Sequence, residues 1–332
     1  MIRDKLCIVS WDGADVEMLQ ARYELSEYRN IYRAQDVLSL PMSKKPILSL
    51  FYLSAVPCLR LLDNGWLREH MVVIVTDNEE FIREKELYPE FLDIVSVDSI
   101  NGHEVEMISY YQKLGKLVEK HRKTGGNGIV FDLINILNSC DSTTAIHDIN
   151  AVRYVRILLE AAKEANYYTE PLSMTGLCQE TEASLLHDIG KVLIPRGILL
   201  KPAPLTDSEF VLMREHVDYG GKILDYINNR VCDDGVMKLA RNYCDFHHEW
   251  WNGNGYPEGL YGEHIPIQGR IMAIADVYDV MVSRRPYKDP VSHEEALEVI
   301  YSEAGTHFDP YLVEIFSTVV DKIRAVERRS FS

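Results

Sequence analysis

Three side chains that could bind a metal ion or a phosphate group lie within the five-residue segment HDIGK, residues 187–191. The segment follows an apolar stretch, so we predict it on a helix, where neighbouring residues point about 100° apart. His187 and Asp188 would then flank one point in space, with Lys191 on the same side. An imidazole and a carboxylate suit iron, manganese or zinc, and an ammonium group attracts a bound phosphate. Structural histidines are common, so this segment alone gives weak support for a metal site.

Three further segments contain residues of the same kinds. His247 and His248 are adjacent and run into a loop that the glycines and the proline at 253–257 impose. Asp276 lies in an otherwise apolar segment, where an unpaired carboxylate would cost several kcal/mol and therefore needs a cation. That cation could be a metal ion or an ion-pair partner, and a helix cap would also explain the residue. His216, taken alone, is more typical of an ordinary amphipathic helix.

The composition restricts the kind of partner. The chain has 332 residues, 46% of them hydrophobic, and a formal net charge of −16. This length permits two domains. The negative charge excludes a non-specific binder of nucleic-acid polymers, which needs an attractive positive field. A phosphate-bearing ligand would need local positive charge, and metal ions could supply it.

The sequence also indicates the cellular compartment. There is no apolar run of 18 residues and no secretory segment near the N-terminus. The six cysteines are scattered and form no CxxC pair, which is typical of reduced intracellular thiols. We therefore expect a cytoplasmic protein with no membrane span.

Residues 1–122 alternate short β-branched runs with charged, helix-compatible segments, a pattern that indicates an α/β domain with a parallel sheet. We expect strands at 6–10, 47–53, 72–76 and 93–97. The layout resembles a response-regulator receiver domain. It has no Asp between Asp36 and Asp63 to act as phosphoacceptor, and no lysine at the end of the last run. We therefore predict a degenerate, unphosphorylated receiver-like domain with a sensory or interaction role.

Three glycines in residues 123–128 mark a linker. Beyond it the apolar residues follow a helical period, and we predict an all-α domain over 129–326. The expected helical segments are 145–166, 180–191, 207–226, 270–282 and 293–303. In the first of them the predicted apolar stripe consists of Ile149, Val152, Val155 and Leu159.

The chain resembles the HD-GYP family in five segments that occur in the same order: HDIGK, IPRGILLKPAPLT, HHEWWNGNGYPEGLYGEHIP, GRIMAIADVYDVMVSRRPYK and GTHFDP. The resemblance covers about residues 145–320. Members of this family are bacterial phosphodiesterases of the HD superfamily that act on cyclic di-GMP. The resemblance implies seven metal ligands, with Asp188 bridging two metal ions. They are His147, His187, Asp188, His216, His247, His248 and Asp276.

Two departures from the family pattern bear on the metal site and its loop. Many members have a Glu four residues before the first ligand histidine, where it helps to hold a third metal. This chain has Thr143 there, so we expect two metal ions. Asn252 stands where the family usually has an aspartate, which alters the charge of the loop. Five imidazoles and two carboxylates without a thiolate suit iron or manganese and do not exclude zinc. The resemblance favours iron, with manganese as the alternative.

The resemblance further implies hydrolysis of cyclic di-GMP to linear pGpG, with continued cleavage to GMP as an option. Asp188 and Lys191 would be catalytic, and Lys191, Arg285, Lys288 and Tyr256 would contact the substrate. Taken alone, Arg285 and Lys288 are more typical of a solvated basic turn. The loop that contains Tyr256 would also contact diguanylate cyclase (GGDEF) domains, as it does in the family.

Two other functions stay open at this point. The chain could be a catalytically weak or inactive receptor that holds a cyclic dinucleotide or a partner protein. It could also be a general HD-superfamily phosphohydrolase of nucleotide monoesters. The remaining histidines have no metal partner that the sequence indicates, and we expect them to be structural or at the surface. They are His70, His103, His121, His264, His293 and His307.

Overall fold

The computed structural model divides the chain into two compact units, Met1–Gly125 and Gly126–Ser332. In the first unit it describes five strands, residues 104–122 and residues 124–125. In the second it describes residues 126–328 except 127, 141–143, 168–173, 232–234 and 284–289. The division falls within the glycine-containing segment 123–128.

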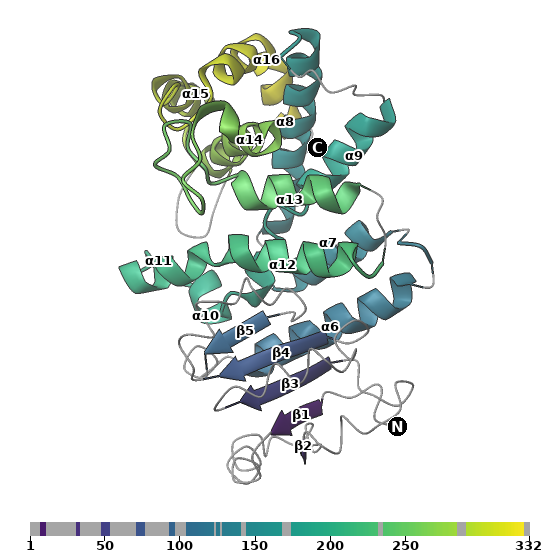
Figure 1. Ribbon diagram of the computed structural model, residues 1–332. Helices are drawn as coiled ribbons and strands as arrows, with labels where there is room; N and C mark the ends of the chain where they lie inside the picture. The colour runs from purple at the N-terminus through teal and green to yellow at the C-terminus, as the bar shows by residue number, and fades with distance from the viewer. Residues whose placement is uncertain are drawn as a thin grey trace. The chain divides into compact units, whose positions relative to one another are not determined.

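The first unit contains a parallel five-stranded sheet (Figure 1). The strands are β1 (Cys7–Ser10), β2 (Ile31–Arg33), β3 (Leu48–Leu53), β4 (Met71–Thr76) and β5 (Asp93–Ser96). Their order is β2-β1-β3-β4-β5, one of the common orders of doubly wound α/β folds. In register, Val9 pairs with Phe51, Phe51 with Ile74, and Ile74 with Ile94. Helix α6 (Glu104–Arg122) follows the last strand.

The sequence located four of these strands and missed β2. This strand has three residues and lies at the edge of the sheet, where a strand pairs on one side only. A three-residue run is too short to show a period of two. The apolar β4, in contrast, shows the continuous run that is typical of a parallel strand.

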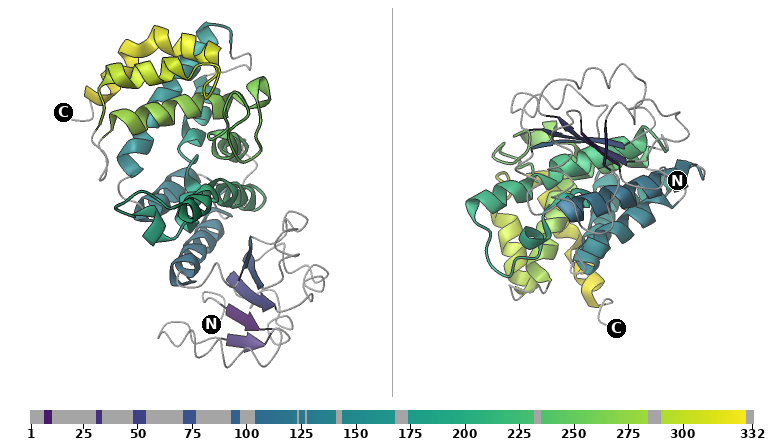
Figure 2. Two further views of the ribbon diagram at one scale, coloured as in Figure 1. Left: turned by 90° about the vertical axis from the view of Figure 1, so that its left-hand side faces the viewer. Right: turned by 90° about the horizontal axis from the view of Figure 1, so that it is seen from below.

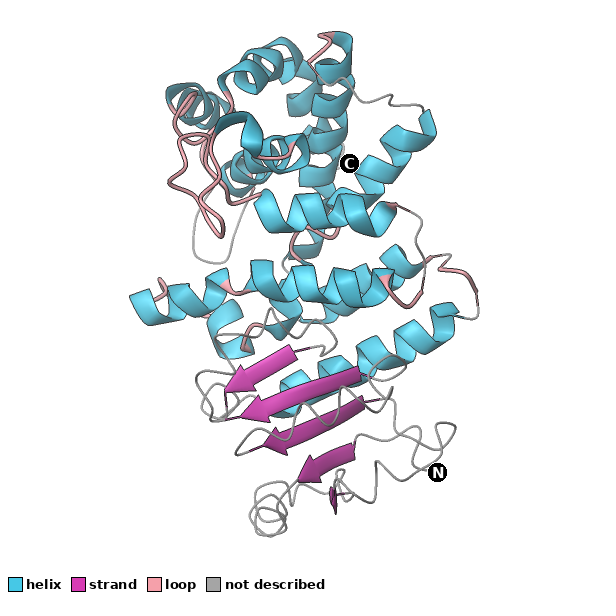
Figure 3. Cartoon of the chain, in the orientation of Figure 1, coloured by secondary structure: helices cyan, strands magenta, loops and turns pink. Residues whose placement is uncertain are grey.

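The second unit is helical, and its described part contains no β-strand (Figure 3). Its first helices are α7 (Ile129–Cys140), α8 (Thr144–Glu164), α9 (Met174–Ser184), the 3-10 helix η5 (Ile189–Leu193), α10 (Arg196–Leu199) and α11 (Asp207–Arg214). They are followed by α12 (His216–Asn228), α13 (Val236–Phe246), the 3-10 helix η6 (Gly262–His264), α14 (Ile267–Val282), α15 (His293–Ser302) and α16 (Pro310–Arg328). The turned views in Figure 2 show strands in the purple and blue part of the chain and helices in the green and yellow part. No described helix is long and apolar enough to cross a membrane.

Helix α8 forms the centre of the helical unit, against α9, α14 and α16. The fully buried Tyr154 of α8 meets Tyr278 of α14 edge to face, with ring centroids 5.4 Å apart. Tyr278 in turn packs against Phe316 of α16 in the same manner. These aromatic contacts hold α8, α14 and α16 together.

The predicted stripe on α8 is correct for Val152, Val155 and Leu159, which are buried, and wrong for Ile149, which is 48% exposed. Three residues turn a helix by 300°, which is 60° short of a full turn. Residues spaced three apart therefore move around the helix by 60° at each step. Ile149 therefore lies about 120° from Val155, outside the buried face.

Helix starts follow local capping chemistry. The Thr206 hydroxyl accepts from the Glu209 backbone N–H, and Glu209 accepts from the Thr206 backbone, so a capping box opens α11. Ser292 and Glu295 repeat this arrangement at α15. Such boxes satisfy backbone donors that a helix leaves unpaired at its start.

Gly190 allows η5 to lie directly against α12. A Cβ on Gly190 would be 1.8 Å from the carbonyl oxygen of His216 and 2.4 Å from the backbone nitrogen of Gly220. Both obstacles are backbone atoms, which cannot rotate away. The close approach therefore requires glycine in the middle of the segment 187–191.

We predict that Gly190→Ala lowers the free energy of unfolding by about 3 kcal/mol, the upper end of typical overpacking costs. The measurement is denaturant unfolding of the full chain, followed by helical circular dichroism. Gly197→Ala is the matched control, because no atom lies within 4 Å of its added Cβ. That control should change stability by less than about 1 kcal/mol. Equal unfolding midpoints for the two variants would contradict the close approach.

Candidate metal centre

The segment 187–191 lies in a turn and a 3-10 helix. Helix α9 ends at Ser184, a turn follows, and η5 begins at Ile189. The predicted regular helix over 180–191 is therefore wrong in its second half. A 3-10 helix has three residues per turn, which still aligns Asp188 with Lys191. The Lys191 ammonium donates a hydrogen bond to Asp188 Oδ2.

His216 begins α12 immediately after α11 ends at Arg214. The segment 207–226 is thus two helices, where the sequence predicted one. Residues two positions apart on a helix point about 200° apart, so His216 is buried although Arg214 is exposed. The amphipathic pattern continues across the break, which is why periodicity alone does not reveal it.

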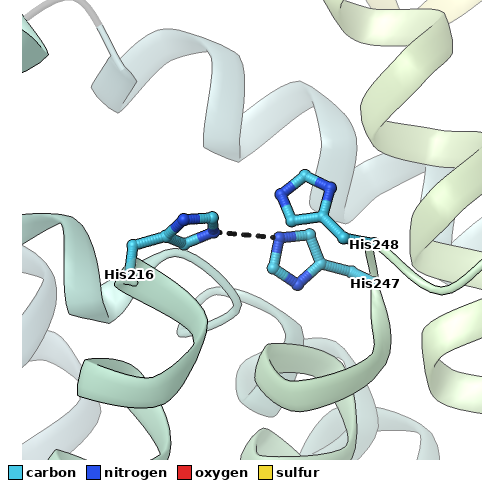
Figure 4. A group of neighbouring side chains, drawn as sticks. All are labelled: His216, His247 and His248. Carbon is cyan, nitrogen blue, oxygen red and sulfur yellow. Dashed lines mark hydrogen bonds between the residues drawn. The ribbon is translucent and has the colours of Figure 1, made fainter. Parts of the chain in front are cut away.

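His247 and His248 follow the end of α13 at Phe246. His247 is buried and His248 is partly accessible. Figure 4 shows the rings of His216, His247 and His248 gathered at one place, although two of them follow the end of α13 and one begins α12. One ligand-competent atom from each of these three side chains lies within 4.8 Å of the others.

Three of the histidines are oriented in the same way: their Nδ1 atoms lie within hydrogen-bond distance of the carbonyl oxygen three residues earlier. The pairs are His187 with Ser184 at 3.0 Å, His216 with Met213 at 2.7 Å, and His247 with Cys244 at 2.8 Å. A carbonyl oxygen only accepts, so each Nδ1 carries the hydrogen. The Nε2 atom of each ring then presents a lone pair, as in histidines that bind metals.

These Nε2 atoms surround the carboxylate of Asp188, which is 4% exposed. Nε2 of His216 lies 3.3 Å from Asp188 Oδ1, and Nε2 of His247 lies 3.8 Å from the same oxygen. Nε2 of His187 lies 3.4 Å from Oδ2. Three imidazoles and the ammonium of Lys191, from three segments of the chain, therefore meet at one carboxylate.

The protonation states suit metal binding. Burial lowers the pKa of His216 to about 3 and that of His247 to about 4, and it lowers the pKa of His248 well below its usual range. Burial opposes ionisation of Asp188, but the charge of the Lys191 ammonium outweighs it and holds the pKa of Asp188 well below its usual range. The three imidazoles are thus neutral near pH 7 and the carboxylate is charged. No proton needs to be displaced before a metal binds.

The donor atoms fit a cation between them. With hydrogen on each Nδ1, the 3.4 Å contact between Nε2 of His216 and Nε2 of His247 (dashed in Figure 4) joins two lone pairs. The contacts of both atoms with Asp188 Oδ1 also join acceptors, and this buried oxygen has no hydrogen-bond partner in the described part of the chain. Such contacts are unfavourable unless a cation is shared, and imidazole with carboxylate suits a divalent transition metal.

Comparison with known proteins agrees with this chemistry. The family model described as "HD domain" matches residues 143–312, which is more than half of the chain. The matched range contains every residue of the cluster. The chain belongs to the HD-domain family. Membership implies that the cluster binds divalent metal ions.

Three curated relatives share this HD domain. A "Probable cyclic di-GMP phosphodiesterase" of Vibrio cholerae is 40% identical over 57% of this chain and 43% of its own length. A "Cyclic di-GMP phosphodiesterase" of Thermotoga maritima is 46% identical over 44% of this chain and 39% of its own length. A "3'3'-cGAMP-specific phosphodiesterase 2" of Vibrio cholerae is 37% identical over 60% of this chain and 35% of its own length. The chain thus spans 35% to 43% of the length of these relatives.

The remaining predicted site residues of the HD domain lie either near the cluster or outside the described part of the chain. Asp276 is half-buried in α14, and its charge acts to raise the pKa of His247 against the effect of burial. The ring of Tyr256 stacks on His248 with centroids 4.7 Å apart. His147 is in α8, but its side chain lies outside the described residues. Thr143, Arg285 and Lys288 also lie outside them.

Glu249, which the sequence analysis passed over, shapes the loop that follows the two histidines. Its buried carboxylate accepts hydrogen bonds from the backbone N–H groups of Glu258 at 2.7 Å, Gly259 at 3.0 Å and Leu260 at 3.0 Å. Asn252 Oδ1 accepts from the backbone of Asn254 at 3.0 Å, so this local turn needs an oxygen there and not a charge. The sequence signal that could have revealed Glu249 is its position directly after two candidate ligands and before a glycine-rich loop.

A second overlooked residue, Glu180, supports α13. Its buried carboxylate accepts from the Tyr243 hydroxyl and from the Gln268 amide, both at 3.0 Å. Tyr243 also presents its carbonyl oxygen 3.0 Å from Nδ1 of His247. Glu180 thereby links α9, α13 and α14 behind the cluster. Its position in an amphipathic helix gave no sign of this burial.

The described histidines outside the cluster make structural contacts. His293 lies 2.7 Å from the Tyr278 hydroxyl, and His307 stacks on Trp250 at 4.4 Å. His264 packs edge to face against Tyr261, and His121 is buried beside the linker. His70 and His103 lie outside the described residues.

We predict that His216→Ala lowers the affinity for divalent metal at least roughly tenfold, because loss of a direct ligand should cost no less than loss of a supporting residue. Metal content per chain, measured by mass spectrometry after dialysis, checks this. His264→Ala removes an exposed imidazole outside the cluster and should retain the metal. Equal metal content in the two variants would exclude His216 as a ligand.

We predict that Glu249→Gln increases hydrogen exchange of the amides of residues 258–260 at least about tenfold, because the amide group keeps only one accepting oxygen. Mass spectrometry of exchanged peptides measures the effect. Glu263→Gln, an exposed change in the same loop, is the control and should leave exchange unaltered. Unchanged exchange in Glu249→Gln would mean that other contacts hold the loop.

Proposed function

We propose that the HD domain of this chain hydrolyses cyclic di-GMP to linear pGpG, in line with its resemblance to the HD-GYP family. The single observation that carries the proposal is the buried Asp188 carboxylate, one oxygen of which lies among imidazole Nε2 atoms while the other pairs with Lys191. The names of the relatives support the substrate. Continued cleavage of pGpG to GMP is part of the same proposal.

Two divalent ions, most favourably iron and otherwise manganese, would be held by seven residues. These are His147, His187, Asp188, His216, His247, His248 and Asp276. Such ions, when bound, supply a Lewis acid that lowers the pKa of water and neutralises phosphate charge. Two metal ions, and not three, are proposed because Thr143 offers no carboxylate to hold a third.

The reaction adds one water molecule across a phosphodiester bond. The water oxygen bonds to phosphorus, the bond to the ribose 3′-oxygen breaks, and the proton passes to that oxygen. Asp188 orients the reacting groups from a fixed, charged position, and Lys191 places an ammonium group where the phosphoryl oxygens gain negative charge. The buried histidines exclude bulk water from one side of the centre.

Substrate contacts would come from Lys191, Tyr256, Arg285 and Lys288. The ring of Tyr256 stacks on His248 and so borders the centre. We further propose that the loop containing Tyr256 contacts diguanylate cyclase (GGDEF) domains. Trp250, which is 37% exposed, and the exposed Tyr261 give this loop apolar surface for such a partner.

The first unit is proposed to be a degenerate receiver-like domain that senses or binds a partner. Its parallel strand order β2-β1-β3-β4-β5 supports a doubly wound fold of that kind. The residue after β3 is Ser54, which is not a phosphoacceptor aspartate. A role through phosphorylation of that position is therefore not part of the proposal.

The test is single-turnover incubation of the iron-loaded full chain with cyclic di-GMP, followed by chromatography. We expect pGpG from the unaltered chain and a loss of at least about a hundredfold in rate for Asp188→Asn. Asp225→Asn removes the charge of an exposed carboxylate that pairs with Arg241 and should leave the rate unchanged.

Other outcomes would replace the proposal. Binding of cyclic di-GMP without any product would favour a receptor. Faster hydrolysis of 5′-nucleotides than of the cyclic dinucleotide would favour a general phosphohydrolase. A clear preference for 3′3′-cGAMP in the same assay would retain the reaction and change the substrate.

A further inference from the structure

Arg214 is an exposed cation at the end of α11 that contacts the ring of Tyr256. Its guanidinium carbon lies 4.0 Å from the centroid of that ring. The ring also stacks on His248, whose own ring lies 3.9 Å from that of His247. An aromatic contact series therefore connects the guanidinium to the cluster around Asp188.

Among the described residues, no carboxylate pairs with Arg214. Four other arginines of the helical unit form ion pairs: Arg156 with Glu160, Arg241 with Asp225 and Asp245, Arg270 with Asp309, and Arg324 with Glu294. In a chain of net charge −16, an arginine beside the cluster that lacks such a partner is unusual. Its charge is available to an anionic ligand.

The chemistry of the proposed substrate requires a second cationic position. A cyclic dinucleotide has two phosphodiester groups, and only one can lie at the reacting centre beside Lys191. The other keeps its negative charge, and Arg214 can match it in addition to the proposed substrate contacts Arg285 and Lys288, which lie outside the described residues. A guanidinium that lies against a ring keeps its N–H donors available in its own plane, where they can bind two phosphate oxygens at once.

We propose that Arg214, positioned by Tyr256, binds the non-reacting phosphate of the cyclic dinucleotide. The proposal rests on the proposed function of the same centre. It assigns to Arg214 a binding role separate from the reacting phosphate, since the arginine contacts the ring of Tyr256, which in turn stacks on His248. His216 lies two residues further along and belongs to the cluster itself, so α11 and α12 together would hold both ends of the ligand.

The first test measures KM and kcat for cyclic di-GMP, together with the Kd of its non-hydrolysable phosphorothioate analogue. Arg214→Ala should raise KM and Kd about ten- to a hundredfold and change kcat less than about threefold. Arg214→Lys should give intermediate values of KM and Kd, since lysine keeps the positive charge but lacks the planar guanidinium that binds two phosphate oxygens at once. Arg156→Ala, a change of equal charge at an exposed ion pair on α8, is the control and should match the unaltered chain.

The second test separates phosphate recognition from base recognition. For a phosphate contact, Arg214→Ala should weaken binding of cyclic di-GMP, 3′3′-cGAMP and cyclic di-AMP by the same factor, because all three have the same backbone. A loss confined to ligands that contain guanine would overturn the proposal in favour of a base contact. Loss of bound metal in Arg214→Ala would also overturn it, because the residue would then act on the cluster.

Failure of the proposal is distinguishable from failure of the proposed function. If the unaltered chain binds the analogue and Arg214→Ala matches Arg156→Ala, Arg214 has no such role and the function stands. If the unaltered chain neither binds nor hydrolyses any cyclic dinucleotide, both are wrong.

Discussion

The buried carboxylate of Asp188 is the constraint on which the rest of the helical unit depends. A charge that is 4% exposed costs several kcal/mol unless cations surround it. Lys191 compensates one oxygen from the adjacent turn of η5. The other oxygen lies among imidazole nitrogens without a hydrogen bond in the described part of the chain. The site is therefore incomplete as a set of protein groups and becomes favourable with divalent cations.

Helix ends provide the geometry for this arrangement. The carbonyl groups of the last turn of a helix have no partner within it. In α9, α11 and α13 one such carbonyl lies within hydrogen-bond distance of Nδ1 of a histidine three residues later. Each helix thus fixes the orientation of one ring and leaves its Nε2 directed toward Asp188. The partial negative charge at these three helix ends also favours a bound cation.

Sequence reasoning could find the ligand segments because each one combines a chemically distinctive residue with a break in the pattern. It could not find the path of the chain between them. The apolar residues Leu185 and Leu186 continue the helical period past Ser184, so the end of α9 leaves no mark in the pattern. The chain then packs Gly190 closely against the carbonyl of His216, a contact between residues 26 positions apart (216 − 190) that periodicity cannot reveal. Periodicity likewise continued through Glu215, and the burial of Glu180 depends on two other helices.

Charge explains why metal and ligand binding must be coupled in this centre. Among the charged residues near the described cluster, Asp188 and Asp276 contribute −2 and Lys191 and Arg214 contribute +2, while the buried imidazoles of His216 and His247 are neutral. These four charges cancel, within a chain of net charge −16 that repels anions at long range. A cyclic dinucleotide with two negative charges gains little from such a centre. Each divalent ion would add two positive charges at short range, so the metals that the Asp188 carboxylate requires would create the affinity for the proposed dinucleotide substrate.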